Sequence, residues 1–174
     1  MANLLGINGS IEELMSLVRE SVNYFLSENP SLLDFKVKAH EQAMSHRIAV
    51  YLERRVVGLT VDCEYNKHLD GEKELMMEGD RYKNCNCRVC RNRKPKKNAR
   101  EEIHFRPDII VHKRGNNSQN CIVMEIKKSE FCLFDEAKLV VLTTGKYHYK
   151  LGVFVWFPKK KPEYRFYVDG QPIK

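Results

Sequence analysis

The chain has 174 residues, enough for one domain with a hydrophobic core but too few for two ordinary domains. Hydrophobic residues make up 43% and charged residues 30%, a balance that excludes a wholly disordered chain. No apolar run reaches the roughly 18 residues of a membrane span, and no signal-peptide pattern is visible. We therefore expect a cytoplasmic protein that makes no contact with a membrane.

Two helices are predicted in the first third of the chain. The segment Ser10–Glu13 has the capping-box pattern and is followed by apolar residues at helical spacing, which predicts a helix over residues 11–28. A second helix is predicted over residues 38–55. Glu41 lies in line with the apolar stripe of this helix, and a carboxylate in that position needs a partner.

The remaining elements are apolar or β-branched runs separated by turn signals. Strands are expected at residues 56–65, 109–111, 122–126 and 151–157, with a final edge strand at 164–168 and a third helix at 134–142. This order predicts an α/β fold with a central mixed sheet flanked by helices. We expect one domain over residues 1–174, with a polar insertion at residues 66–101 that has no sustained period.

The positive charge is concentrated in this insertion. Residues 81–100 contain nine Lys or Arg residues and no acidic residue, so the rest of the chain is net −2 although the whole chain is +7. Such a segment suits a polyanion, and nucleic acid is the expected partner. A solvated charged loop is the alternative. The candidate phosphate-binding residues are Arg88, Arg91, Arg93, Lys94, Lys96 and Lys97.

The insertion also contains three closely spaced cysteines, in the pattern Cys85-Asn-Cys87-Arg-Val-Cys90. Three thiols in six residues can converge on Zn²⁺, which needs a fourth ligand. Reduced thiols in a loop and an iron–sulfur cluster are the alternatives. Cys121 and Cys132 are expected to be small core residues. The candidates for the fourth ligand are Cys63, His68 and His104.

Acidic side chains are predicted to meet on a hairpin. Side chains alternate along a strand, so Glu125 and Lys127 share a face. If the strands at 109–111 and 122–126 pair symmetrically about their turn, Asp108 lies opposite Glu125. Two carboxylates this close need a cation between them, and hard oxygen ligands favour Mg²⁺ or Mn²⁺. We expect Glu41 to approach from a helix on the same sheet face. A structural hairpin, in which Glu125 pairs with Lys127 or Arg106, is the alternative.

The pattern Pro107-Asp108, sixteen further residues, then Glu125-Ile126-Lys127 resembles the signature of the PD-(D/E)xK nuclease superfamily, which includes restriction endonucleases. The resemblance covers about residues 38–157 and implies a restriction-endonuclease-like core and Mg²⁺-dependent phosphodiester hydrolysis. It implies that Asp108 and Glu125 are metal ligands, that Glu41 is a direct or water-mediated ligand, and that Lys127 is the catalytic lysine. Lys138 and Glu64 are weaker candidates. Lys138 is expected instead on a solvated helix face.

These features favour a metal-dependent nuclease, an endonuclease or exonuclease that hydrolyses DNA. A zinc-dependent nucleic-acid-binding module without catalysis is one alternative. A catalytic subunit that needs a targeting partner is another. The sequence leaves open whether the substrate is DNA or RNA, and whether the chain acts as a homodimer or with a partner protein.

Overall fold

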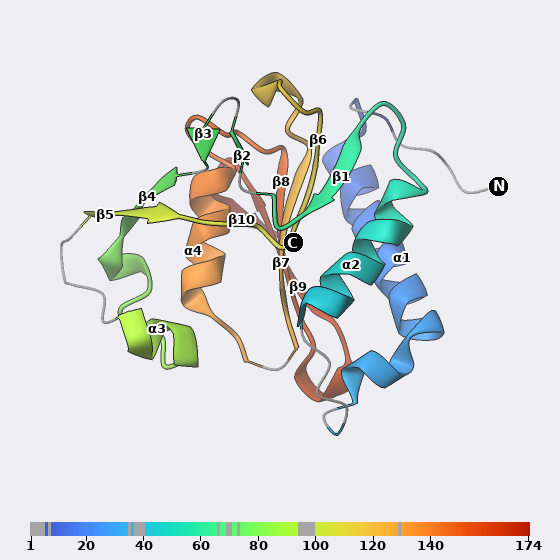
Figure 1. Ribbon diagram of the computed structural model, residues 1–174, viewed down its shortest axis with the longest axis horizontal. Helices are drawn as coiled ribbons and strands as arrows, with labels where there is room; N and C mark the ends of the chain where they lie inside the picture. The colour runs from blue at the N-terminus through green and yellow to red at the C-terminus, as the bar shows by residue number, and fades with distance from the viewer. Residues whose placement is uncertain are drawn as a thin grey trace.

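A mixed six-stranded sheet forms the centre of the protein, with helices on both faces (Figure 1). The strand order is β1-β6-β7-β8-β9-β10, in which β7 and β8 are parallel and the other neighbours are antiparallel. The predicted α/β class and the mixed sheet flanked by helices are therefore confirmed. The computed structural model describes residues 6, 8–34, 36, 41–65, 67–68, 71–72, 74–93, 100–128 and 130–174.

The strands of the central sheet are β1 (Thr60–Cys63), β6 (Ile109–His112), β7 (Ile122–Lys127), β8 (Leu151–Trp156), β9 (Glu163–Val168) and β10 (Gln171–Ile173). Two further strand pairs are β2 (Lys67–His68) with β3 (Gly71–Glu72), and β4 (Glu74–Glu78) with β5 (Arg100–His104). The α-helices are α1 (Ile11–Glu28), α2 (Glu41–Glu53), α3 (Arg88–Arg93) and α4 (Leu133–Leu142). Short 3₁₀ turns are η1 (Pro30–Leu33), η2 (Gly79–Arg81), η3 (Asn117–Gln119) and η4 (Pro158–Lys160).

Helix α1 begins at its predicted capping box. The Glu13 amide donates to Ser10 Oγ at 3.2 Å, and the Ser10 amide donates to the Glu13 carboxylate at 2.8 Å. Both bonds satisfy amides that the first helical turn would otherwise leave unpaired. The predicted bounds of this helix, residues 11–28, are confirmed.

The β6–β7 pair has the register that the sequence predicts. Ile109 lies opposite Met124, and Val111 lies opposite Ile122. Continuing this register by one residue places Asp108, directly before β6, opposite Glu125. The predicted register is therefore confirmed, although the connection is not symmetric: a tight turn pairs Lys113 with Asn116, and η3 adds residues before β7.

Strand alternation divides the core into two layers, one on each face of the sheet. Met124 and Ile126 of β7 pack against α1 and α2, where Phe25 and Leu52 are fully buried. Val123 faces the opposite layer, which contains α4. Figure 1 shows α1 and α2 on one side of the sheet and α4 on the other. Glu125 and Lys127 alternate with Met124 and Ile126, so they emerge on the α4 side.

The insertion, whose sequence has no sustained period, contains regular structure in its described part. We call the described residues between Glu74 and His104 the β4–β5 segment. This segment contains η2 and α3 and packs on α4. Its buried residues include Leu75, Met77 and Tyr82, whose ring lies edge-on to Phe134 of α4. The insertion is mostly polar, so its sequence shows no periodic signal for these few buried apolar residues.

Two further predictions need correction. The predicted final edge strand, β9, is not at the edge, because Gln171–Ile173 forms β10 and pairs with it. The predicted strand at 56–65 is only Thr60–Cys63, since Glu64 has a positive φ of 49° that ends the extended conformation. Among the helices that the structure describes, none has the length and apolar character needed to cross a membrane.

Candidate active site

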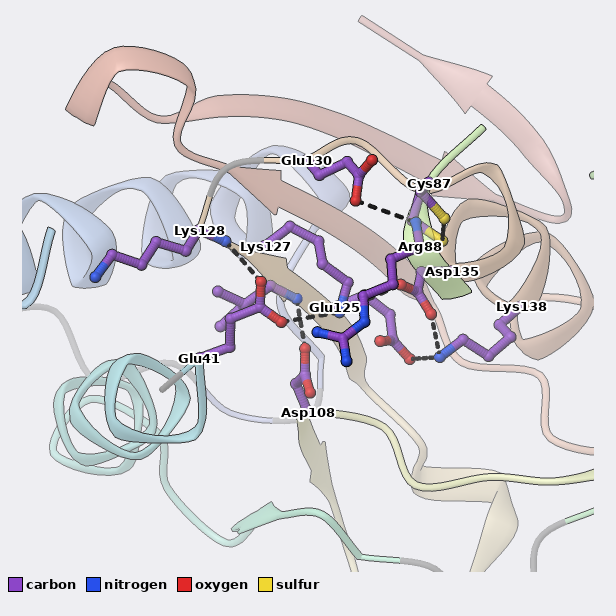
Figure 2. Close-up of polar contacts among 12 residues, drawn as sticks. Glu41, Cys87, Arg88, Asp108, Glu125, Lys127, Lys128, Glu130, Asp135 and Lys138 are labelled. Atoms are coloured by element: carbon purple, nitrogen blue, oxygen red, sulfur yellow. Dashed lines mark hydrogen bonds and ion pairs between the residues drawn. The ribbon is translucent and has the colours of Figure 1, made fainter. Parts of the chain in front are cut away.

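Six charged side chains from four regions converge at one end of β7 (Figure 2). Glu41 comes from the first residue of α2, and Asp108 lies directly before β6. Strand β7 and helix α4 each contribute two side chains. The members of this group, which we call the acidic cluster, are Glu41, Asp108, Glu125, Lys127, Asp135 and Lys138.

Asp108 is held by the strand opposite it. Its Oδ2 accepts a hydrogen bond from the Ile126 amide at 2.6 Å, one residue beyond Glu125. Burial raises the pKa of Asp108 to about 6, although the positive charge of Lys127 opposes this shift. The carboxylate therefore has a defined position beside Glu125.

Glu125 forms an ion pair with Lys138, a buried lysine that the sequence analysis expected on a solvated helix face. Lys138 Nζ lies 2.8 Å from Glu125 Oε1, and the two residues are 6% and 1% exposed. The expected solvated position of Lys138 is therefore wrong. The structural alternative expected Glu125 to pair with Lys127 or Arg106, whereas the described residues pair it with Lys138. Burial raises the pKa of Glu125 to about 8, while the charge of Lys138 acts against this.

Asp135 is a member of the cluster that the sequence analysis missed. Its Oδ1 lies 2.6 Å from Lys138 Nζ, and its Oδ2 lies 3.3 Å from Lys127 Nζ. Burial works against ionisation of Asp135, but the charges of Lys138 and Lys127 outweigh it and lower its pKa. An Asp and a Lys three residues apart in the predicted helix at 134–142 were the available signal, because that spacing places both on one helix face.

Lys127 is a cation surrounded by carboxylates. Its Nζ lies 3.2 Å from Glu41 Oε2 and 3.3 Å from Asp135 Oδ2. Burial favours the neutral amine, but the charges of Asp135, Asp108 and Glu125 outweigh burial and raise the pKa of Lys127 above its usual value. Lys127 therefore remains protonated at neutral pH.

Glu41 reaches the cluster from the other side of the sheet. Its helix α2 packs on the face opposite to Glu125, so the expected approach from the same face is wrong. Glu41 is at the start of the helix, beside the end of β7, where Lys127 Nζ and the Lys128 amide both donate to its carboxylate. The weaker candidate Glu64 instead accepts from Gln42 at 2.6 Å and is exposed.

Two buried carboxylate oxygens in the cluster have a lysine ammonium group beside them. Glu125 Oε1 and Asp135 Oδ2 are buried and have no hydrogen-bond partner among the described residues, although each is within ion-pair distance of a lysine. With all six side chains ionised, four carboxylates and two ammonium groups leave a charge of −2, which one divalent cation would neutralise.

A second cluster consists of thiols. The Sγ atoms of Cys85, Cys87, Cys90 and Cys132 all lie within 4.8 Å of one another and could hold a metal ion such as zinc. The predicted ligands from the insertion are therefore brought together. The fourth member is Cys132, at the N-cap of α4, which corrects its expected role as a simple core residue.

The other candidates for a fourth ligand do not join this thiol cluster. Cys63 is exposed on β1, and His104 faces Glu74 across the β4–β5 pair. The side chain of His68 lies outside the described residues. Cys121 is buried in the core layer of α1 and α2, as expected.

The predicted phosphate-binding residues are described only in part. Arg88 and Arg91 are exposed on α3. The Arg88 amide donates to the Glu130 carboxylate at 3.3 Å, and its side chain extends toward the acidic cluster (Figure 2). Lys94, Lys96 and Lys97 and the side chain of Arg93 lie outside the described residues.

Comparisons of the chain with protein-family models, with curated proteins and with solved structures found no match.

Proposed function

We propose that this protein is a Mg²⁺-dependent nuclease that hydrolyses phosphodiester bonds in DNA, with a restriction-endonuclease-like core of the PD-(D/E)xK type. The observation that carries the proposal is the position of Asp108 opposite Glu125, with Lys127 two residues further along the same strand. The resemblance noted in the sequence supports it. Carboxylate oxygens are the ligands that Mg²⁺ or Mn²⁺ prefers.

The residues of the acidic cluster fit a hard cation. Asp108 and Glu125 would hold it, and Glu41 would contribute directly or through water from the exposed rim of the cluster. A cation at Glu125 Oε1 would replace the contact that this oxygen makes with Lys138 at 2.8 Å. When bound, Mg²⁺ would orient and acidify a water molecule and stabilise charge on a phosphate oxygen.

Lys127 lies beside the proposed metal ligands, with its ammonium group 3.2 Å from the Glu41 carboxylate. From there it could donate a hydrogen bond and stabilise the additional negative charge that develops on the phosphate. It could also help to position and deprotonate the attacking water.

The proposal is tested by incubating plasmid DNA and labelled single-stranded DNA with the full chain and Mg²⁺ or Mn²⁺. The variants are Glu125→Gln, Asp108→Asn and Lys127→Met. Each should reduce cleavage by about 100-fold or more, since each removes a ligand or a charge that acts in the transition state. Glu102→Gln is the matched control, because Glu102 is an exposed carboxylate on β5.

Unchanged cleavage in Glu125→Gln and Lys127→Met would overturn the proposal. The thiol cluster and the exposed Arg88 and Arg91 favour one competing function, a zinc-dependent nucleic-acid-binding module. That function predicts DNA binding without cleavage in the wild type and in Glu125→Gln alike. A chain that binds Mg²⁺ but cleaves no DNA would point to a catalytic subunit that needs a partner protein.

A further inference from the structure

We infer that Cys85, Cys87, Cys90 and Cys132 bind one zinc ion, which fastens the β4–β5 segment to the start of α4 and thereby positions Lys138 and Asp135. The assignment of the zinc site is independent of the proposed nuclease activity. The positioning role rests on that proposed function.

The spacing of the sulfur atoms suits a single metal ion. Cys132 Sγ lies 3.2 Å from Cys87 Sγ and 3.9 Å from Cys90 Sγ. Four sulfurs around one zinc ion, with Zn–S bonds of about 2.3 Å, lie about 3.8 Å apart at the corners of a tetrahedron. In an iron–sulfur cluster the cysteines bind more than one iron atom, which separates their sulfurs further. The close group therefore favours a mononuclear site.

Backbone amides point at two of these sulfurs. The Leu133 amide donates to Cys85 Sγ at 3.3 Å, and the Cys90 amide donates to Cys87 Sγ at 3.4 Å. A hydrogen bond to sulfur favours the thiolate, which is the form that binds metal. Such outer partners also fix the direction of the ligands in metal sites. These bonds are an observation independent of the distances between the sulfurs.

The four ligands come from two segments that are far apart in sequence. Three lie between η2 and the first turns of α3, and Cys132 follows more than forty residues later as the N-cap of α4. A metal that joins them closes this long loop and adds its binding free energy to folding. The β4–β5 segment has only a small apolar core, which includes Leu75, Met77 and Tyr82. The free energy of metal binding is therefore large relative to the stabilisation that this core provides.

The site also joins the insertion to the acidic cluster. Asp135 lies one helical turn after Cys132, and Lys138 follows one turn later on the same face. Cys87 is followed directly by Arg88, whose amide contacts Glu130 just before Cys132. Fastening the start of α4 therefore limits the movement of Lys138 relative to Glu125. Loss of the metal should therefore increase the mobility of α4 and of the β4–β5 segment together.

The first experiment measures the metal content of the purified full chain by mass spectrometry. The wild type and Cys121→Ser should each contain one zinc ion per chain, because Cys121 is buried in the other core layer. Cys132→Ser and Cys87→Ser should lose most of it. Cobalt substitution of the wild type should give the visible absorption of a tetrahedral thiolate site. A protein that binds neither zinc nor cobalt would overturn the proposal, as would bound iron or a disulfide between Cys87 and Cys132.

The second experiment keeps the proposal testable if the cysteine variants fail to fold. Zinc is removed from the wild-type protein with a chelator and then restored, and amide hydrogen exchange is followed by mass spectrometry. Exchange should rise in residues 74–93 and 133–138 after removal, stay unchanged in α1, and return with zinc. Unchanged exchange in both regions would overturn the positioning role. Neither measurement requires DNA or Mg²⁺, so a failed cleavage assay leaves the zinc site standing.

Discussion

Lys138 places its ammonium group 2.8 Å from the Glu125 carboxylate, in a position where both side chains are almost wholly buried. The lysine therefore supplies the positive charge that a divalent cation would otherwise provide. Removing one partner of a buried pair is costly, because the other charge remains without compensation.

We therefore expect Lys138→Met to reduce the free energy of unfolding by about 3 kcal/mol in the absence of divalent ions. Mg²⁺ should restore part of this loss, since the proposed metal would neutralise the same carboxylate. Urea unfolding with and without Mg²⁺ measures both effects. Lys146→Met is the control, because Lys146 is exposed. An equal response of both variants to Mg²⁺ would contradict this account of Glu125.

Glu41 is expected to matter less than Glu125, because its side chain is 39% exposed and already bonded to the Lys128 amide. Glu41→Gln keeps one carbonyl acceptor for that amide but loses a charge. We expect stability to change by less than about 1 kcal/mol and the Mg²⁺ requirement for cleavage to rise several-fold. Metal titrations of activity test this prediction. Glu53→Gln, at the other end of α2, should leave the titration unchanged.

Arg88 is expected to contact a phosphate of the substrate. Its side chain extends toward the acidic cluster from an exposed position on α3 (Figure 2). Arg88→Ala should weaken DNA binding severalfold and reduce the salt dependence by about one released counterion. Fluorescence anisotropy at several salt concentrations measures both. Arg81→Ala is a matched control, because Arg81 lies near Glu78. If DNA affinity depended on salt concentration identically in the wild type, Arg88→Ala and Arg81→Ala, the result would count against the contact.

The pH dependence of stability should reflect Asp62. Burial disfavours its ionised form, but hydrogen bonds from Arg114 and His112 outweigh burial and lower its pKa. A carboxyl with a lowered pKa stabilises the fold above its unfolded value of 3.8, and this contribution is lost as the pH falls through the folded value.

Asp62→Asn should therefore reduce stability by roughly 1–2 kcal/mol at pH 6 to 7. The difference from the wild type should shrink below about pH 4, where both states of the wild type become protonated. Urea unfolding at a series of pH values provides the measurement. Asp169→Asn, an exposed carboxylate in the last turn, should show little difference at any pH. A constant difference for Asp62→Asn down to pH 2 would refute the assignment.

The local parts of the fold were readable in the sequence. The Ser10 and Glu13 pattern determined where α1 begins, because the capping bonds join residues only three apart. Strand alternation predicted that Asp108 lies opposite Glu125, since a slip of one residue would move the apolar side chains of β6 and β7 to the wrong faces. For this reason three residues of the acidic cluster could be placed from their spacing alone.

The partners of those residues depended on tertiary structure. Lys138 reaches Glu125, and Asp135 reaches Lys127, only because α4 crosses over the sheet between the parallel strands β7 and β8. Cys132 joins the thiol cluster only because the β4–β5 segment packs on that helix. Sequence spacing predicts which side chains share a strand or a helix face. Which faces meet depends on burial summed over the whole chain, so only the folded structure decides it.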